Sequence, residues 1–206
     1  LFPESIETTA KESVYWTQFW VDNGYKADQV VYAKWSGAES LNSVSEDLSR
    51  PQVRIVGLVV GMVDKIMHGA QLGTASMHNQ VRQWAEGPYL GELFDCLLSQ
   101  GFRVYLTSDH GNLEATGCGR PNEGAVADLC GARARVYPDG ILRQRVKEKF
   151  PEAIEWDSTG LPQNYVVLVA PHRQAFVQKG LRVVCHGGIA LEEIIVPLVE
   201  IERETR

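Results

Sequence analysis

The sequence has few cysteines and no long apolar run. Its four cysteines include no Cys-x-x-Cys pair, which argues against a disulfide-stapled scaffold and a cysteine-based zinc site. The most apolar stretches, 55–63 and 166–170, are too short to cross a bilayer. Residues 1–5 do not show the charged, apolar and small-residue order of a signal peptide. We therefore expect a cytoplasmic protein with no membrane partner.

Positive charge is also scarce. The 206 residues include 20 Lys and Arg against 26 Asp and Glu, so the net charge is −6 and the pI about 5.4. This balance provides no global basic surface for nucleic acid or an anionic membrane. A hydrophobic fraction of 44% excludes a disordered or fibrous chain. We expect a single domain over 1–206, with a poorly defined N-terminal region at about 1–50.

Apolar strands that alternate with helical patterns indicate the fold class. A valine-rich run over 54–63 is typical of a strand buried in a parallel sheet. Helical patterns at 74–86 and 89–100 follow, and a second strand pattern covers 102–107. Strand, helices and strand in this order form the crossover of a parallel sheet. We therefore predict an α/β fold, a mostly parallel sheet with helices on both faces.

The remaining elements are expected at the flanks of these stretches. At 132–137, Arg133 and Arg135 alternate with small or apolar residues, which favours an edge or half-exposed strand. Both arginines point to one side of such a strand. They would either meet a substrate phosphate or face solvent. Helices are expected at 12–21 and 141–150, and strands at 132–137, 164–170, 181–185 and 194–201.

Three polar clusters follow directly after apolar strands. They are Asp64-x-x-x-His68, Asp109-His110 and His186 before two glycines. Because the carboxyl ends of strands line the ligand crevice in open α/β sheets, the clusters can converge on one site. Carboxylates and imidazoles suit zinc or manganese, and paired metals clamp the oxygens of a phosphoryl group. Taken singly, each cluster is also explained as a helix start or a turn, and their combination favours a metal site.

Longer motifs surround these clusters. They are TSDHGNLEA at 107–115, GARARVY at 131–137 and HGGIALEEIIVP at 186–197. Together they resemble the PglZ family of the alkaline phosphatase superfamily, a component of BREX phage-defence systems in bacteria. The resemblance extends over 54–201. It implies an alkaline phosphatase-like core.

The resemblance also implies a ligand set and a reaction. One divalent ion would be held by Asp64, His68 and His186, and a second by Asp109 and His110 with two further ligands. Zinc is the first expectation and manganese the second. The implied reaction is attack on a phosphoester by a Ser or Thr hydroxyl, with a covalent phosphoryl intermediate. The implied partners are a phosphoester substrate, with nucleotides and nucleic acids as candidates, and other BREX proteins such as a methyltransferase.

The nucleophile of the family is not evident in the sequence. It belongs after a first strand near the start of the domain, and no apolar strand ending in Asp precedes residue 54. Thr8 and Thr9 are candidates by residue type alone. We expect a C-terminal fragment whose nucleophile lies upstream of Leu1. Such a fragment would be inert or nearly inert and would hold one metal.

Other interpretations stay open. The domain would be a metal-dependent phosphodiesterase or phosphatase, or a non-catalytic scaffold within the defence complex. A phosphoglycerate mutase-like branch is a third hypothesis, whereas a sulfatase is disfavoured because Cys-x-Pro-x-Arg is absent. Glu192 and Glu193 would either support His186 through its second ring nitrogen or carry helix-surface charge. His78 and His172 are expected to be solvated, or to contact the metal ligands rather than the metal itself.

Overall fold

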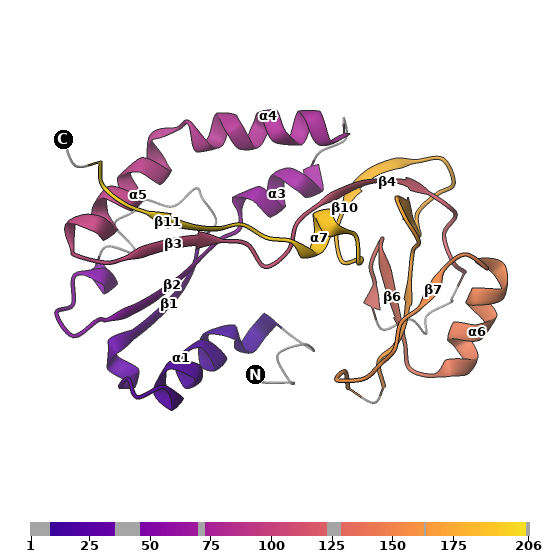
Figure 1. Cartoon of the computed structure of the whole chain (residues 1–206), viewed down its shortest axis with the longest axis horizontal. Coiled ribbons are helices and arrows are strands. Elements are labelled where there is room, and N and C mark those ends of the chain that lie inside the picture. The colour runs from indigo at the N-terminus through magenta and orange to yellow at the C-terminus, as the bar shows by residue number, and fades with distance from the viewer. Residues whose placement is uncertain (1–8, 36–45, 70–72, 123–128, 163, 205–206) are drawn as a thin grey trace. The chain divides into compact units, whose positions relative to one another are not determined.

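The structure is a computed structural model and is shown in Figure 1. Its contacts divide the chain into two compact units. Unit 1 comprises Leu1–Ile66, Val81–Leu106 and Val199–Arg206, and unit 2 comprises Met67–Gln80 and Thr107–Leu198. The residues that the structure describes are 9–35, 46–69, 73–122, 129–162 and 164–204.

Unit 1 contains a parallel strand pair covered by a helix. Strands β1 (Val30–Trp35) and β2 (Ile55–Val60) pair in parallel, and helix α1 (Glu12–Asp22) packs on β1. The indole of Trp16 reaches the pair from α1 because Gly57 of β2 leaves room for it. A Cβ at Gly57 would lie 2.6 Å from the Trp16 ring. The expected helix at 12–21 is confirmed, whereas β1 lies in the region expected to be poorly defined.

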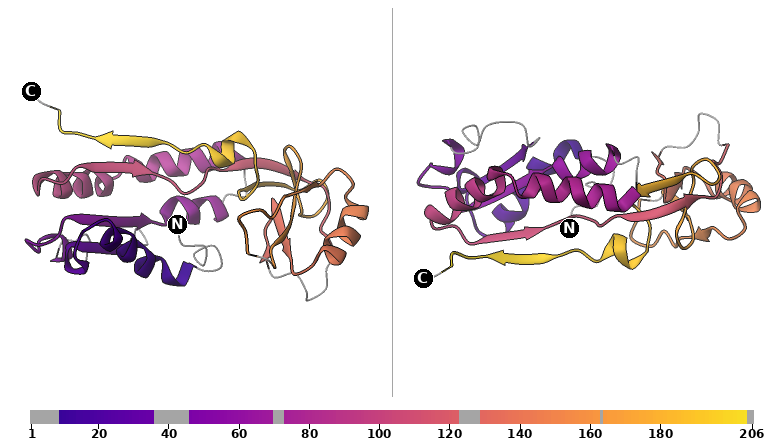
Figure 2. Two further views of the ribbon diagram at one scale, coloured as in Figure 1. Left: turned by 60° about the horizontal axis from the view of Figure 1, so that its bottom comes forward. Right: turned by 90° about the horizontal axis from the view of Figure 1, so that it is seen from above.

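Unit 1 also contains helix α5 (Pro88–Ser99) and a second strand pair. Helix α5 begins at proline, whose missing N–H is not needed at the first helical position, and Gly101 follows its end with a φ of +83°. Both boundaries confirm the expected helix at 89–100. Strands β3 (Val104–Thr107) and β11 (Leu198–Ile201) pair and run side by side in both views of Figure 2. The core of the unit is formed by Trp35, Leu48, Leu93, Leu97 and Val104.

Two small sheets form the body of unit 2. The first has the order β10-β4-β9, in which β4 (Leu113–Gly117) pairs antiparallel with β10 (Arg182–Cys185) and parallel with β9 (Gln174–Ala175). The second has the order β5-β6-β8-β7 and is antiparallel. Its strands are β5 (Leu129–Cys130), β6 (Ala134–Tyr137), β7 (Ile154–Glu155) and β8 (Val166–Val169).

Helices complete unit 2. Helix α6 (Gly140–Lys149) packs against β6 and β8 (Figure 1). Asp139 caps this helix by accepting the backbone N–H of Leu142 at 2.8 Å. The short helix α7 (Leu191–Ile194) precedes β11, so the expected strand at 194–201 begins later than predicted. Helices α3 (Met62–Gly69) and α4 (Gly73–Ala85) each include residues of both units.

The predicted class, mixed α/β, is confirmed, but one large parallel sheet is not seen among the described residues. The prediction assumed that the helices between 62 and 99 bring the strands on either side together. Instead, β2 pairs with β1 and β3 pairs with β11. The strand expected at 132–137 is present as β6, but its expected edge position is wrong, because β6 pairs on both sides. Within the described ranges, no helix combines the length and apolar character needed to span a membrane.

Candidate metal centre

Helix α3 presents two of the predicted ligands on one face. Asp64 and His68 are four residues apart on this continuous helix, and residues at that spacing are neighbours on a helix surface. Both are exposed. The helix begins directly after β2, at the carboxyl end of that strand. The sequence spacing was therefore enough to predict this half of the site.

The antiparallel β4–β10 pair brings two further histidines together. Leu113, at the start of β4, is the partner of Cys185, at the end of β10. His110 comes shortly before β4 and His186 directly after β10, so both lie at the same end of this pair. Their rings are stacked, with centroids 3.9 Å apart and planes inclined by 8°. The His68 ring lies 6.0 Å from that of His186, in an edge-on arrangement.

A three-residue donor set results. The ligand atoms of Asp64, His68 and His186 all lie within 4.8 Å of one another. One carboxylate and two imidazoles form a donor set that suits zinc and related divalent ions. The set is partly open to solvent, because His186 is half-buried and the other two side chains are exposed.

The other predicted pair lies beside this set. The Asp109 side chain is 90% exposed, and its Oδ1 accepts the backbone N–H of His110 at 3.1 Å. His110 Nδ1 lies 3.0 Å from the Gly111 carbonyl oxygen. Because a carbonyl oxygen can only accept, Nδ1 is the donor in that hydrogen bond. Nε2 is the nitrogen 3.8 Å from Asp109 Oδ1.

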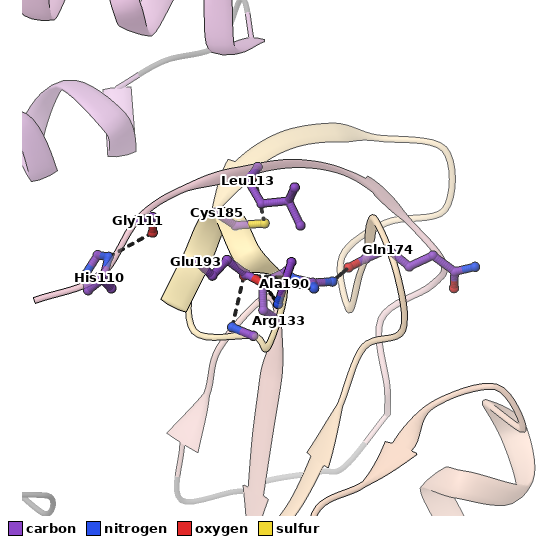
Figure 3. Close-up of polar contacts among 9 residues, drawn as sticks. His110, Gly111, Leu113, Arg133, Gln174, Cys185, Ala190 and Glu193 are labelled. Atoms are coloured by element: carbon purple, nitrogen blue, oxygen red, sulfur yellow. Dashed lines mark hydrogen bonds and ion pairs between the residues drawn. The ribbon is translucent and has the colours of Figure 1, made fainter. Parts of the chain in front are cut away.

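A buried ion pair lies behind the histidines. Arg133 Nε and Nη2 donate to the two carboxylate oxygens of Glu193 at 2.9 and 3.0 Å, and both side chains are 1% exposed. Arg133 also donates to the Gln174 carbonyl. Figure 3 shows this arrangement beside His110 and Cys185. The half-exposed position predicted for Arg133 is therefore wrong, because its donors point into the protein.

Glu193 also forms hydrogen bonds with the backbone that follows His186. Its two carboxylate oxygens accept the N–H groups of Gly188 and Ala190, both at 3.0 Å. Burial raises the pKa of Glu193, but the hydrogen bonds from Arg133 and from these amides outweigh it and lower the pKa overall. Glu193 is therefore a carboxylate at neutral pH. Its predicted support of the His186 ring stays a prediction.

The remaining candidates take other positions. Arg135 is 5% exposed and donates to the Phe176 carbonyl at 3.0 Å, so it too points inward. A substrate-binding role for Arg133 and Arg135 stays a prediction. Burial raises the pKa of Cys185 to about 11, so this residue is a thiol beside His186 at neutral pH. Thr9 is exposed in a 3₁₀ turn, His78 and His172 are exposed, and Thr8 lies outside the described residues.

A comparison with protein families decides the relationship. The model of the BREX system PglZ alkaline phosphatase-like domain matches residues 3–201. The chain belongs to the PglZ family. The resemblance seen in the sequence is thereby confirmed, and the PglZ match covers nearly the whole chain and extends over parts of both units. Membership of the BREX system implies that other BREX components are its partners.

A second comparison gave no match. None of the proteins with curated descriptions is significantly similar to this PglZ domain.

Proposed function

We propose that this PglZ domain binds a divalent metal at Asp64, His68 and His186 and belongs to a cytoplasmic, metal-dependent phosphoester hydrolase. The gathering of these three donors from α3 and from the end of β10 is the observation that carries the proposal. Zinc is the first choice of metal and manganese the second. An alkaline phosphatase-like core agrees with phosphoester chemistry.

Each side chain of the proposed metal site has its own role. Asp64 supplies charge that offsets the dication, and His68 and His186 supply neutral nitrogen donors. A bound dication polarises a phosphoryl oxygen and stabilises the charge that develops on it. His110 and Asp109 lie beside the donor set and form part of a second metal site, as the resemblance implies. The Ser or Thr nucleophile stays a prediction.

The first experiment measures metal uptake. The chain is stripped of metal and titrated with Zn²⁺ or Mn²⁺ by calorimetry, and bound metal is counted by elemental analysis. We expect about one equivalent with the wild type, and a loss of at least tenfold in affinity with His186→Ala. His78→Ala is the matched control, because His78 is an exposed histidine of unit 2 outside the donor set. Equal affinity in both variants would contradict the proposal.

The second experiment tests the reaction in the intact defence protein. Hydrolysis of bis-p-nitrophenyl phosphate should require added Zn²⁺ or Mn²⁺ and should fall at least a hundredfold with Asp64→Asn. His172→Ala, a change at another exposed histidine, should leave the rate unchanged. A metal-independent rate would exclude the proposed chemistry.

A non-catalytic docking role is the second candidate. It is favoured by the apolar surface of α7 and the residues after it, where Leu191, Ile194 and Ile195 are 67%, 58% and 66% exposed. Exposed aliphatic side chains in a row are typical of interaction surfaces. Partner binding, for example to the methyltransferase, would then survive His110→Ala and fail with Ile194→Asp. The opposite pattern would rule the docking role out.

A further inference from the structure

One buried residue, Glu193, connects the two loops that carry the stacked histidines. Glu193 accepts the Gly188 N–H through its side chain, two residues after His186. The Glu193 backbone carbonyl accepts the N–H of Gly111 at 2.8 Å, one residue after His110. The same residue therefore contacts both histidine loops, which are distant in the sequence.

The loops are packed too tightly for any side chain at the two glycines. A Cβ at Gly111 would lie 2.0 Å from the Glu192 carbonyl oxygen. A Cβ at Gly188 would lie 2.5 Å from a carboxylate oxygen of Glu193 and 2.8 Å from Arg133 Nε. These close approaches explain the glycines after both histidines: the backbone at Gly188 packs on the Arg133–Glu193 pair, and the backbone at Gly111 packs on the backbone of α7.

Arg133 fixes the carboxylate that makes these contacts. Its guanidinium is planar and binds both oxygens of Glu193, which sets the orientation of the carboxylate plane. A third donor goes to the Gln174 carbonyl, which ties the guanidinium to the backbone at β9. With the amide hydrogen bonds from Gly188 and Ala190, these contacts restrict the rotation of the Glu193 side chain.

We propose that Arg133 and Glu193 are positioning residues that hold His110 and His186 in register for metal binding. The inference rests on the proposed function for its purpose, but its geometry is independent of any metal. Neither residue touches a ring of the two histidines in the contacts described above. They act through the backbone of Gly111 and Gly188 instead.

The test uses a spectroscopic signature of the metal-free chain. The protons of stacked histidine rings are shifted upfield by the neighbouring ring current, so ring signals of His110 and His186 report their stacking. In Glu193→Gln, the amide nitrogen is a donor that faces either Arg133 Nε and the Gly188 N–H or Arg133 Nη2 and the Ala190 N–H, so the loops should move. We expect both ring signals to shift, while those of His78 and His172 stay in place. Zn²⁺ affinity should fall ten- to a hundredfold.

Glu192→Gln is the matched control. Glu192 is the preceding residue of the same helix and also pairs with an arginine, Arg173, but this pair is solvent-exposed. Its removal should leave ring signals and Zn²⁺ affinity unchanged. If Glu193→Gln does not fold, the double variant Arg133→Met with Glu193→Leu replaces it, because an apolar pair of similar volume removes the contacts without leaving a buried charge.

The outcomes separate this inference from the proposed function. Folded Glu193→Gln with wild-type ring signals would overturn the positioning role, whatever the metal does. A wild type that takes up no Zn²⁺ would overturn the proposed function, and the ring signals would still decide the positioning role. Shifted ring signals with a weaker Zn²⁺ affinity in Glu193→Gln alone would support both.

Discussion

The two halves of the candidate metal centre are built differently. On α3, Asp64 and His68 are exposed and owe their proximity to one turn of helix. At the ends of β4 and β10, His110 and His186 depend on strand pairing and on a fully buried ion pair. The first half is local in sequence. The second joins residues that are 60 or more positions apart.

This difference shows where the fold contributes to the site. A helix face brings two ligands together at almost no further cost in free energy, because the helix itself fixes their spacing. The loop half requires a buried charge pair, which stabilises only when its hydrogen bonds are complete. Substitutions should therefore affect the stability of the two halves very unequally.

The largest effect is expected from breaking the buried pair. Glu193→Leu leaves Arg133 charged and unpaired in the interior and should cost about 3–5 kcal/mol of unfolding free energy. For a chain of this size the melting temperature should drop by roughly 10 °C. Glu192→Leu, at the exposed pair, should cost about 1 kcal/mol or less. Equal melting temperatures of the two variants in a thermal scan would show that the buried pair contributes no more to stability than the exposed pair.

A smaller loss is expected from filling the contact between the loops. Gly111→Ala forces the backbone away from the Glu192 carbonyl and should cost about 1–3 kcal/mol in urea unfolding. Gly91→Ala is the control with the opposite sign. Gly91 is an exposed residue of α5 with open space at its Cβ, and alanine there should gain about 0.5–1 kcal/mol. A stabilising Gly111→Ala would contradict the described packing.

The buried ion pair should make the stability of the chain depend on pH. The pKa of Glu193 is lowered from an ordinary value of 4.5 in the folded chain. Its contribution to stability is therefore complete above about pH 4.5 and is lost as the pH falls through the folded pKa. The difference in unfolding free energy between wild type and Glu193→Gln should shrink below pH 4.5. A difference that stays constant down to pH 3 in urea titrations would refute the assigned shift.

The smallest effect on stability is expected on α3. Asp64→Asn and His68→Gln change exposed side chains of a helix, so each should alter the unfolding free energy by about 0.5 kcal/mol or less. Zn²⁺ affinity should nevertheless fall at least tenfold in both variants. A large loss of stability without metal would mean that these residues serve the fold rather than the site.

The helical half of the site was predictable and the loop half only in part. The Asp64-x-x-x-His68 spacing matches one helical turn, so its geometry follows from the sequence alone. The ends of the strands near His110 and His186 were also predicted. The pairing of these strands was not predicted. Their register depends on contacts between residues far apart in the sequence, such as Leu113 and Cys185, which are 72 positions apart.

The buried ion pair between Arg133 and Glu193 was not predicted from the sequence, for a physical reason. Arginine and glutamate are almost never buried unless paired, so exposure is the default expectation for each. Helix α7 is too short to show which side of it faces the interior. The available signal was the set of small residues around Arg133, namely Gly131, Ala132 and Ala134, which leave space for a large buried side chain.

The strands of the N-terminal and C-terminal regions were missed or misplaced by local patterns. Strand β1 contains aromatic and charged residues, and its pairing with β2 decides its structure more than its own periodicity does. The apolar run at 194–201 begins in helix α7, and Pro197 separates that helix from β11. A proline cannot donate to a strand ladder, which is why the strand starts only at Leu198.

The β4–β10 pair has a consequence for how this family can diverge. Because the register of two strands fixes the spacing of His110 and His186, the length of chain between them does not enter that spacing. We therefore expect the centre to tolerate insertions around α6, provided that Arg133 and the backbone at Gln174 keep their positions. On this basis we expect domains of different length to keep the same pair of histidine loops.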